Sequence, residues 1–283
     1  MMYYILYNPT SSSKNLDGKL NKLYKKLSKN SVSYKINMLE INSMERVFIS
    51  QCNSDDIVIV CGGDGTLDQF INRISGALIK CRLFYYSLGS GNDFSREYSK
   101  YFEITDLINH LPTVKINDKE NYFFLNGVGM GIDALVCRSK AQYKFAEVKK
   151  SYFSISITAI KNFRPYSLDV EIDGEKRHFE NVWFFTCNNG KYMGGGMKVC
   201  PKASRNDDLL DVCIVHSISH RKILAVFPFI YIGKHVWFKK YVEIFRCKKF
   251  SAIPDGCSLL QRDGEVLDYV RSVDASFNSS QNK

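Results

Sequence analysis

The stretch that decides the fold of the first half of the chain is residues 56–72, Asp-Ile-Val-Ile-Val-Cys-Gly-Gly-Asp-Gly-Thr-Leu-Asp-Gln-Phe-Ile-Asn. The β-branched run at 57–60 predicts a buried strand. Apolar residues from Leu67 to Ile74 recur at helical spacing and predict a helix that begins near Thr66. The glycine turn between the two would aim free N–H groups and the positive end of the helix dipole at one place. It predicts an anion site, such as one for a nucleotide phosphate, or else a tight turn without a ligand.

Strands and helices alternate on both sides of this stretch. The expected strands are residues 3–7, 34–39 and 82–86, and the expected helices are residues 16–27 and 42–52. This alternation predicts a parallel sheet with helices on both faces, and ligands bind off the carboxyl ends of the strands in such sheets. The loops at 8–14, 62–66 and 87–93 all leave such ends, so we expect them to converge. The serine-rich first loop also fits an ordinary turn, and Asp93 in the third also fits a helix N-cap.

After Leu111-Pro112 the pattern changes to short β-rich segments joined by tight turns such as Asp173-Gly174. The expected strands are 113–117, 121–128, 166–173, 177–188, 209–215, 241–249 and 257–262, and the expected helices lie near 140–163 and 219–233. This half therefore reads as an antiparallel β-sandwich. We expect an α/β nucleotide-binding domain at 1–114 and the β-sandwich at 115–267, with the tail 268–283 a candidate to return to the first domain.

Composition narrows the class of partner. The formal charge of +10 favours anions, but the basic residues are scattered, which argues against nucleic acid. Nine cysteines without a Cys-x-x-Cys pair predict free thiols in a reducing cytoplasm. The longest apolar stretch, 223–238, is interrupted and too short to span a bilayer, so we expect a soluble protein.

The second half carries polar candidates of its own. A glycine-rich turn with a carboxylate, Asp133, follows the strand expected at 121–128. The carboxylates of 206–211 suit a hard divalent cation, although a solvated surface turn is the plainer interpretation. Glu265 lies just past the Asp263-Gly264 turn, whose residues are also those of an ordinary β-turn.

In order along the chain, Gly-Gly-Asp-Gly-Thr at 62–66, Gly-Ser-Gly-Asn-Asp-Phe at 89–94, Asn-Gly-Val-Gly-Met-Gly-Ile-Asp-Ala at 126–134, the acidic run 207–211 and Asp-Gly-Glu at 263–265 form a set. This set resembles the diacylglycerol kinase catalytic family, which includes soluble bacterial lipid kinases and sphingosine kinases. The resemblance implies ATP held between an N-terminal nucleotide domain and a C-terminal β-sandwich.

The resemblance also implies roles for individual residues. Glu265 would be the general base, and Asp93 and Asp133 are the other candidate catalytic carboxylates. Asp207 would bind a structural Mg²⁺ together with the carbonyl groups of Ser204 and Leu209, and a water network would link that ion to Asp93. The expected ATP-binding residues are Asn8, Thr10, Ser11, Ser12, Ser13, Lys14, Gly62, Gly63, Asp64, Gly65, Thr66, Gly89, Ser90 and Asn92.

Two positions depart from the family pattern: Asp68-Gln69 replaces the common Asn-Glu, and Asp208 replaces the glycine that usually follows Asp207. The leading interpretation is an ATP-dependent kinase for diacylglycerol or another long-chain lipid alcohol. The alternatives are a kinase for a soluble acceptor such as NAD and a silent nucleotide- or lipid-binding protein. We expect a cytoplasmic protein, peripheral to the membrane, that touches anionic lipid transiently through the segment 223–238 or packs that segment on the sandwich. A homodimer is possible.

Overall fold

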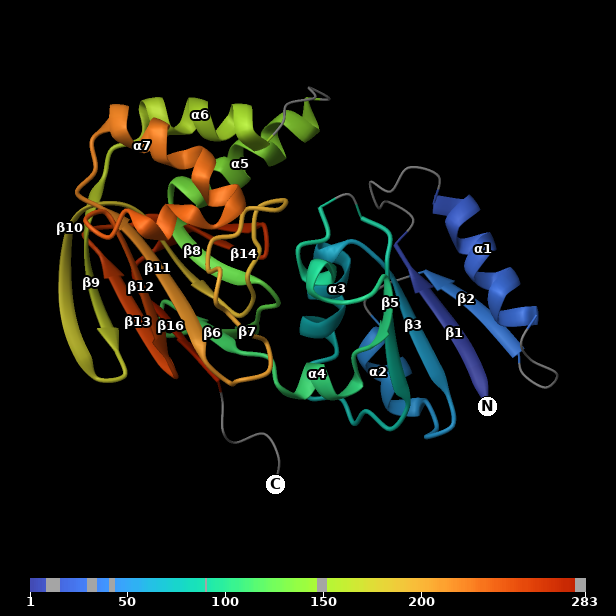
Figure 1. The fold of residues 1–283 in the computed structure, drawn as a ribbon. Helices are drawn as coiled ribbons and strands as arrows, with labels where there is room; N and C mark the ends of the chain where they lie inside the picture. The colour runs from blue at the N-terminus through green and yellow to red at the C-terminus, as the bar shows by residue number, and fades with distance from the viewer. Residues whose placement is uncertain (9–15, 30–34, 41–43, 90, 147–151, 278–283) are drawn as a thin grey trace. The chain divides into compact units, whose positions relative to one another are not determined.

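The computed structural model describes residues 1–8, 16–29, 35–40, 44–89, 91–146 and 152–277 (Figure 1). The chain forms two compact units, Met1–His110 and Leu111–Lys283, and each is described by itself. The expected fold class is confirmed: an α/β unit is followed by an antiparallel β unit. The second unit begins four residues earlier than expected, because the strand β6 (Thr113–Ile116) belongs to its sheet.

The N-terminal unit contains a five-stranded sheet. In spatial order its strands are β2 (Lys35–Glu40), β1 (Met2–Tyr7), β3 (Ile57–Gly62), β4 (Arg82–Ser87) and β5 (Tyr101–Glu103). The first four run parallel, as the alternation of strands and helices predicts. The edge strand β5 runs antiparallel to β4 and was not expected.

Helices cover both faces of this sheet (Figure 1). The helix α1 (Leu16–Lys29) packs Leu20 and Leu23 against the face that carries Ile5 and Ile59. The opposite face meets α2 (Glu45–Gln51), where the rings of Tyr4 and Phe48 lie 4.9 Å apart, and α3 (Asp64–Arg73). The central strand β3 is buried along its whole length because neighbours and helices cover it on every side.

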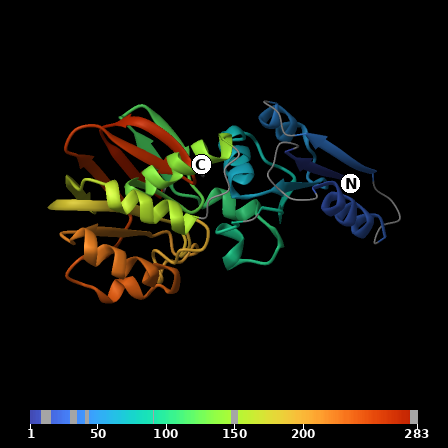
Figure 2. The ribbon, with the colours of Figure 1, turned by 90° about the horizontal axis from the view of Figure 1, so that it is seen from above.

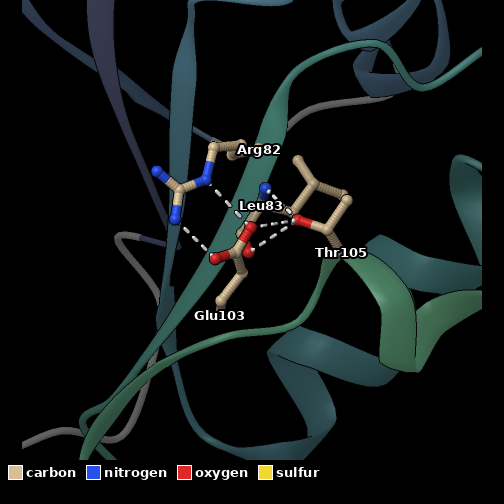
Figure 3. A network of polar contacts seen from close by, with 4 residues as sticks. All are labelled: Arg82, Leu83, Glu103 and Thr105. Carbon is tan, nitrogen blue, oxygen red and sulfur yellow. Dashed lines mark hydrogen bonds and ion pairs between the residues drawn. The ribbon is translucent and has the colours of Figure 1, made fainter.

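A polar network fixes the antiparallel edge strand (Figure 3). Arg82 on β4 donates from Nε and Nη2 to the two carboxylate oxygens of Glu103 on β5, at 3.0 and 2.6 Å. Thr105, which opens α4 (Thr105–Asn109), accepts the Leu83 N–H through Oγ1 at 2.8 Å. Arginine and carboxylate side by side lower the pKa of Glu103 and raise that of Arg82. These contacts hold the segment that follows the 87–93 loop against the edge strand β4.

The C-terminal unit contains an 11-stranded antiparallel sheet. The main path is β15 (Glu265–Val270), β14 (Ser258–Arg262), β8 (Gly127–Gly131), β10 (Glu175–Asn188), β9 (Tyr166–Ile172), β13 (Lys249–Pro254), β16 (Val273–Ser276), β6 and β7 (Glu120–Phe123), with β11 (Leu210–His216) on β10 and β12 (Val242–Cys247) on β11. The sheet wraps around a core with Val128, Phe185 and Phe250. The tail strand β16 pairs with β13 and β6, so it belongs to this sheet rather than to the N-terminal one.

Helices gather on one side of the C-terminal sheet (Figure 1, Figure 2). They are α5 (Ile132–Phe145), α6 (Tyr152–Asn162), α7 (His220–Val226) and two short 3₁₀ turns at Phe227–Ile232 and Lys234–Trp237. Between these helices and the sheet lies a second core, here called the helix-side core, built from residues such as Ile132, Val136, Trp183 and Met193. The helix expected at 140–163 is thus two helices, and the first follows β8 directly.

Candidate active site

Two glycine loops of the N-terminal unit lie against each other backbone to backbone. Strand β3 ends at Gly62 and α3 begins at Asp64. A Cβ added to Gly89 would lie 2.7 Å from the Cα of Gly63, and one added to Gly63 would lie 3.3 Å from the Cα of Gly89. Only glycine permits this approach. Two of the three loops expected to converge therefore meet.

Hydrogen bonds hold the two loops in this position. The Leu88 N–H donates to the Gly62 carbonyl at 2.7 Å, and the Phe94 N–H donates to Oδ2 of Asp64 at 3.2 Å. Asp64 therefore braces the second loop. Asp93 lies at the start of the turn that follows, largely buried, with Oδ1 at 3.4 Å from Nε of Arg96.

The start of α3 is a candidate anion site. Its N-cap, Gly63, has an extended backbone, and among the described residues no side chain caps the helix. The amino end of a ten-residue helix that follows a strand is a natural place for a phosphate group. Lys19 of α1 donates from Nζ to the Leu88 carbonyl at 3.3 Å, which brings a cation beside the second glycine loop.

The other expected nucleotide contacts are only partly placed. Asn8 follows β1 directly and is half-buried, while Asn92 donates from Nδ2 to the Gly89 carbonyl and holds a positive φ of 46°. Thr66 is buried against Gly62, whose added Cβ would lie 2.5 Å from the Thr66 Cβ. The expected contacts Thr10, Ser11, Ser12, Ser13, Lys14 and Ser90 lie outside the described residues.

In the C-terminal unit, a carboxyl group lies over a glycine in the middle of the sheet. Gly129 of β8 pairs with Thr186 of β10 on one side and with Gln261 of β14 on the other. A Cβ added to Gly129 would lie 2.3 Å from Oδ2 of Asp133. Gln261 donates from Nε2 to the same oxygen at 3.2 Å. The run 127–131 is therefore a strand rather than the expected glycine turn, and its missing side chains give the Asp133 carboxyl its place.

Burial sets the charge of this carboxyl group. Asp133 as a residue is partly exposed, yet its Oδ1 is buried and has no hydrogen-bond partner among the described residues. Burial raises the pKa of Asp133 to about 8, so the group is mostly protonated at neutral pH. Thr186 Oγ1 and the Tyr166 hydroxyl are likewise buried without a partner within the described chain. Burial, and secondarily the nearby Asp133, raise the pKa of Tyr166.

The acidic turn before β11 is closed by an arginine. Asp207 accepts the Leu209 N–H through Oδ1 at 3.2 Å, and its Oδ2 contacts Nη2 of Arg246 on β12. Nε of Arg246 also lies 3.7 Å from Oδ1 of the buried Asp211, whose pKa burial raises to about 6. The described residues hold no group of three or more acidic, histidine or cysteine side chains placed for a metal. Arg246 thus occupies the one carboxylate that the resemblance assigns to a structural Mg²⁺, while the roles of the Ser204 and Leu209 carbonyl groups stay predictions.

The two carboxylates of the Asp-Gly-Glu turn lie in different surroundings. Asp263 accepts the N–H groups of Asn126 and Gly127 at 2.8 and 3.3 Å, as well as that of Leu125, and thus fixes the start of β8. Glu265 opens β15 and is exposed. Asp93 belongs to the N-terminal unit and Glu265 to the C-terminal unit, so the role of Glu265 as general base stays a prediction.

Both units of the chain match models of known protein families. Residues 2–117 match the family model described as "Diacylglycerol kinase catalytic domain", and residues 126–274 match the one described as "YegS C-terminal NAD kinase beta sandwich-like domain". The two matches follow the two units of the structure. The chain belongs to the diacylglycerol kinase catalytic-domain family.

Individual proteins resemble this chain in sequence or in fold. YtlR of Bacillus subtilis (strain 168), which carries a lipid kinase name, is 25% identical over 94% of this chain and 93% of its own length. A diacylglycerol kinase of Mycobacterium tuberculosis (strain ATCC 25618 / H37Rv) is 26% identical over 64% of this chain and 62% of that protein. A crystal structure from Bacillus anthracis str. Sterne, named for a diacylglycerol kinase, superposes with a TM-score of 0.69 at 21% identity over 99% and 98% of the two chains. This last likeness shows the fold.

Sequence reasoning missed the residues that surround Asp133 and Asp207. Thr186, Gln261 and Arg246 sit inside strands with no motif around them. Only the strand register brings them to the carboxylates, and the long connections between those strands hide the register from the sequence. One feature of the sequence could have pointed to this site: Gln261 is a polar residue within the strand expected at 257–262. A buried strand position usually carries an apolar residue.

Proposed function

We propose that this protein is an ATP-dependent kinase that phosphorylates the hydroxyl group of diacylglycerol or of a related long-chain lipid alcohol. Family membership supports phosphoryl transfer. The nucleotide would bind as MgATP, with its phosphates at the glycine loops around Gly63 and Gly89 and at the start of α3. The protein would contribute backbone N–H groups and positioning there, and a magnesium ion bound with the nucleotide would supply positive charge to offset the charge that develops.

The observation that carries the lipid assignment is the place of the Asp133 carboxyl, which lies beside the helix-side core with its Oδ1 buried and without a partner among the described residues. A lipid hydroxyl that enters apolar surroundings needs a hydrogen-bond partner, because an unpaired buried hydroxyl is costly. Neutral Asp133 can both donate and accept, and the hydroxyl of Thr186 lies in the adjacent strand position. We assign Asp133 to binding of the acceptor hydroxyl, and Glu265 remains the candidate that removes its proton.

The environment of Asp133 favours a lipid over NAD as the acceptor. NAD would carry ribose, amide and phosphate groups that require many polar partners. The helix-side core instead presents aliphatic, aromatic and thioether side chains, among them Ile132, Val136 and Met193. Met193 Sδ itself lies 3.3 Å from Nε2 of Gln261, so the helix-side core directly contacts the side chain that donates to Asp133.

A membrane surface is the second part of the proposal. Trp237 and Ile232 are 68% and 60% exposed on the two 3₁₀ turns, and Lys234 lies over the Trp237 ring at 4.8 Å from its centroid. Exposed aromatic and aliphatic side chains among lysines are typical of contact with anionic lipid. No helix among the described residues is long and apolar enough to cross a membrane.

A transfer assay tests the kinase proposal. Radiolabelled ATP and Mg²⁺ are offered with diacylglycerol, ceramide or a long-chain base in mixed micelles, and with NAD in solution. We expect label in a lipid product, and Asp133→Leu should raise the KM for the lipid about tenfold or more while the KM for ATP stays unchanged. The control Asp169→Asn removes an exposed carboxylate of β9 and should change neither constant.

Label in NAD alone would refute the lipid assignment, and no label in any acceptor would favour the silent binding protein. Sedimentation with vesicles that contain or lack anionic phospholipid tests the surface separately. Trp237→Ser should lower binding to anionic vesicles. Equal sedimentation of the variant and the wild type would contradict the membrane surface.

A further inference from the structure

The acidic turn at the start of β11 is built around an arginine. Three strands carry one row of residues in register: Asn188 on β10, Asp211 on β11 and Arg246 on β12. Because side chains alternate along a strand, members of a row share one face of the sheet. The guanidinium of Arg246 therefore lies on the same face as Asp211, and from there it reaches Asp207 in the turn.

Each oxygen of Asp207 already has a partner. Oδ1 accepts the N–H of Leu209, two residues on, which is the hydrogen bond of an Asx-turn. Oδ2 contacts the guanidinium. Asp208 between them has a positive φ of 52°, a backbone region that aspartate enters more readily than most residues. The aspartate in place of the family's glycine therefore adopts the turn conformation that glycine would supply.

We propose that the guanidinium of Arg246 takes the place of a structural Mg²⁺ in this protein and clamps the turn through Asp207. The expectation of a metal comes from the family, whereas the replacement rests on this chain's own side chains. The guanidinium donates to Asp207 and places its charge 3.7 Å from Asp211 Oδ1, although neither Asp211 oxygen has a hydrogen-bond partner among the described residues. A divalent ion at Asp207 would meet the positive charge of Arg246 at contact distance, so the two cations exclude each other.

If Arg246 replaces the metal, the stability of the folded protein should not depend on magnesium, whereas a protein with a structural metal ion would lose stability without it. Magnesium would be needed only as the companion of the nucleotide. The folded, nucleotide-free protein should hold no magnesium and should gain no thermal stability from it. With a structural metal, removal of that metal would loosen the start of β11, and the protein's melting temperature would fall.

The experiment uses the purified full-length chain, freed of nucleotide and dialysed against EDTA and then against metal-free buffer. Bound magnesium is measured by mass spectrometry, and Tm is recorded with EDTA or with MgCl₂ alone. For the wild type we expect magnesium far below one ion per chain and the same Tm in both conditions. Asp207→Asn should lower Tm by about 2–4 °C in EDTA, because the ion pair is lost.

Two further variants sharpen the result. Arg246→Gln frees Asp207 and removes the positive charge near Asp211, so its Tm should fall in EDTA and rise again when MgCl₂ is added. Arg138→Gln is the matched control: Arg138 on α5 is 44% exposed, as Arg246 is, and pairs with the exposed Asp268, and its loss should leave Tm within about 1 °C.

A magnesium content near one ion per chain in the wild type, or a wild-type Tm that falls in EDTA, would overturn the proposal. So would an Asp207→Asn protein that is destabilised only when magnesium is present. Asp207→Asn decides the question by itself should Arg246→Gln fail to fold. None of these readouts needs turnover, so the clamp can fail while the kinase proposal stands, and the reverse.

Discussion

Replacing Gly129 by alanine should damage the C-terminal unit far more than the same change two residues earlier. Both glycines lie on one face of β8. At Gly129 the added Cβ would lie 2.3 Å from Asp133 Oδ2, 2.7 Å from the Phe185 carbonyl oxygen and 2.9 Å from Thr186 Cγ2. At Gly127 the nearest atoms would be the Cys187 carbonyl oxygen and the Asn188 side chain, at 3.1 and 3.2 Å.

The magnitudes follow from what must move. In Gly129→Ala the Phe185 carbonyl belongs to a neighbouring strand and cannot yield cheaply, so overpacking should cost about 1–3 kcal/mol. Displacement of the Asp133 carboxyl breaks its bond from Gln261, worth about another 1 kcal/mol. In Gly127→Ala a shift of a few tenths of an ångström is enough, and the cost should stay below about 1 kcal/mol.

Tryptophan fluorescence is the appropriate assay, because both tryptophans of the chain, Trp183 and Trp237, belong to the C-terminal unit. Urea unfolding followed this way reports on that unit. We expect a clear loss of stability in Gly129→Ala and a small one in Gly127→Ala. Equal losses in the two variants, or a larger loss in Gly127→Ala, would refute the placement of the Asp133 carboxyl over Gly129.

Three further outcomes test the two sites. Gly89→Ala would put a Cβ 2.7 Å from the Cα of Gly63, so it should separate the glycine loops and weaken ATP binding about tenfold or more in calorimetry, with tryptophan-detected unfolding unchanged. Thr186→Val removes a buried hydroxyl that has no partner among the described residues, so stability should hold or rise by about 1 kcal/mol while the KM for the lipid rises. Because the pKa of Asp133 is raised to about 8 in the folded state, the folded protein binds the extra proton and wild-type stability should fall as pH rises from about 4 to about 8. Asp133→Asn should reduce that slope by at most about 1.4 kcal/mol per pH unit in urea titrations, and the reduction should be clearest above the pKa of about 6 that burial gives Asp211.

The N-terminal site could be predicted from the sequence because its parts follow one local rule. A buried strand, a glycine turn and a helix come in immediate succession, and parallel strands bring their carboxyl ends to one edge. The bracing role of Asp64 could not be foreseen, because its partner is the backbone N–H of Phe94, thirty residues on. The antiparallel strand β5 was missed because three residues give no readable period.

The C-terminal site depends on strand register, which single-sequence patterns do not fix across long connections. Asp263 was expected at a turn and does lie in the turn after β14, yet its carboxylate accepts the backbone N–H of Asn126, far away in sequence. Arg246 faces Asp211 only because β11 and β12 pair as they do across the connection that contains α7. The acidic run at 207–211 alone therefore suggested a metal.

Alternation along β8 explains why a run that looks like a turn is a central strand. Val128 and Met130 point into the core that the sheet encloses, and both are fully buried. The glycines between them face the other way, where Asp133 and Thr186 fill the space that side chains would have taken. The same five residues thus supply apolar packing on one side and room for a buried carboxyl on the other. Any residue larger than glycine at 129 would expel the group that we assign to the acceptor, so the chemistry of this site depends on a missing side chain.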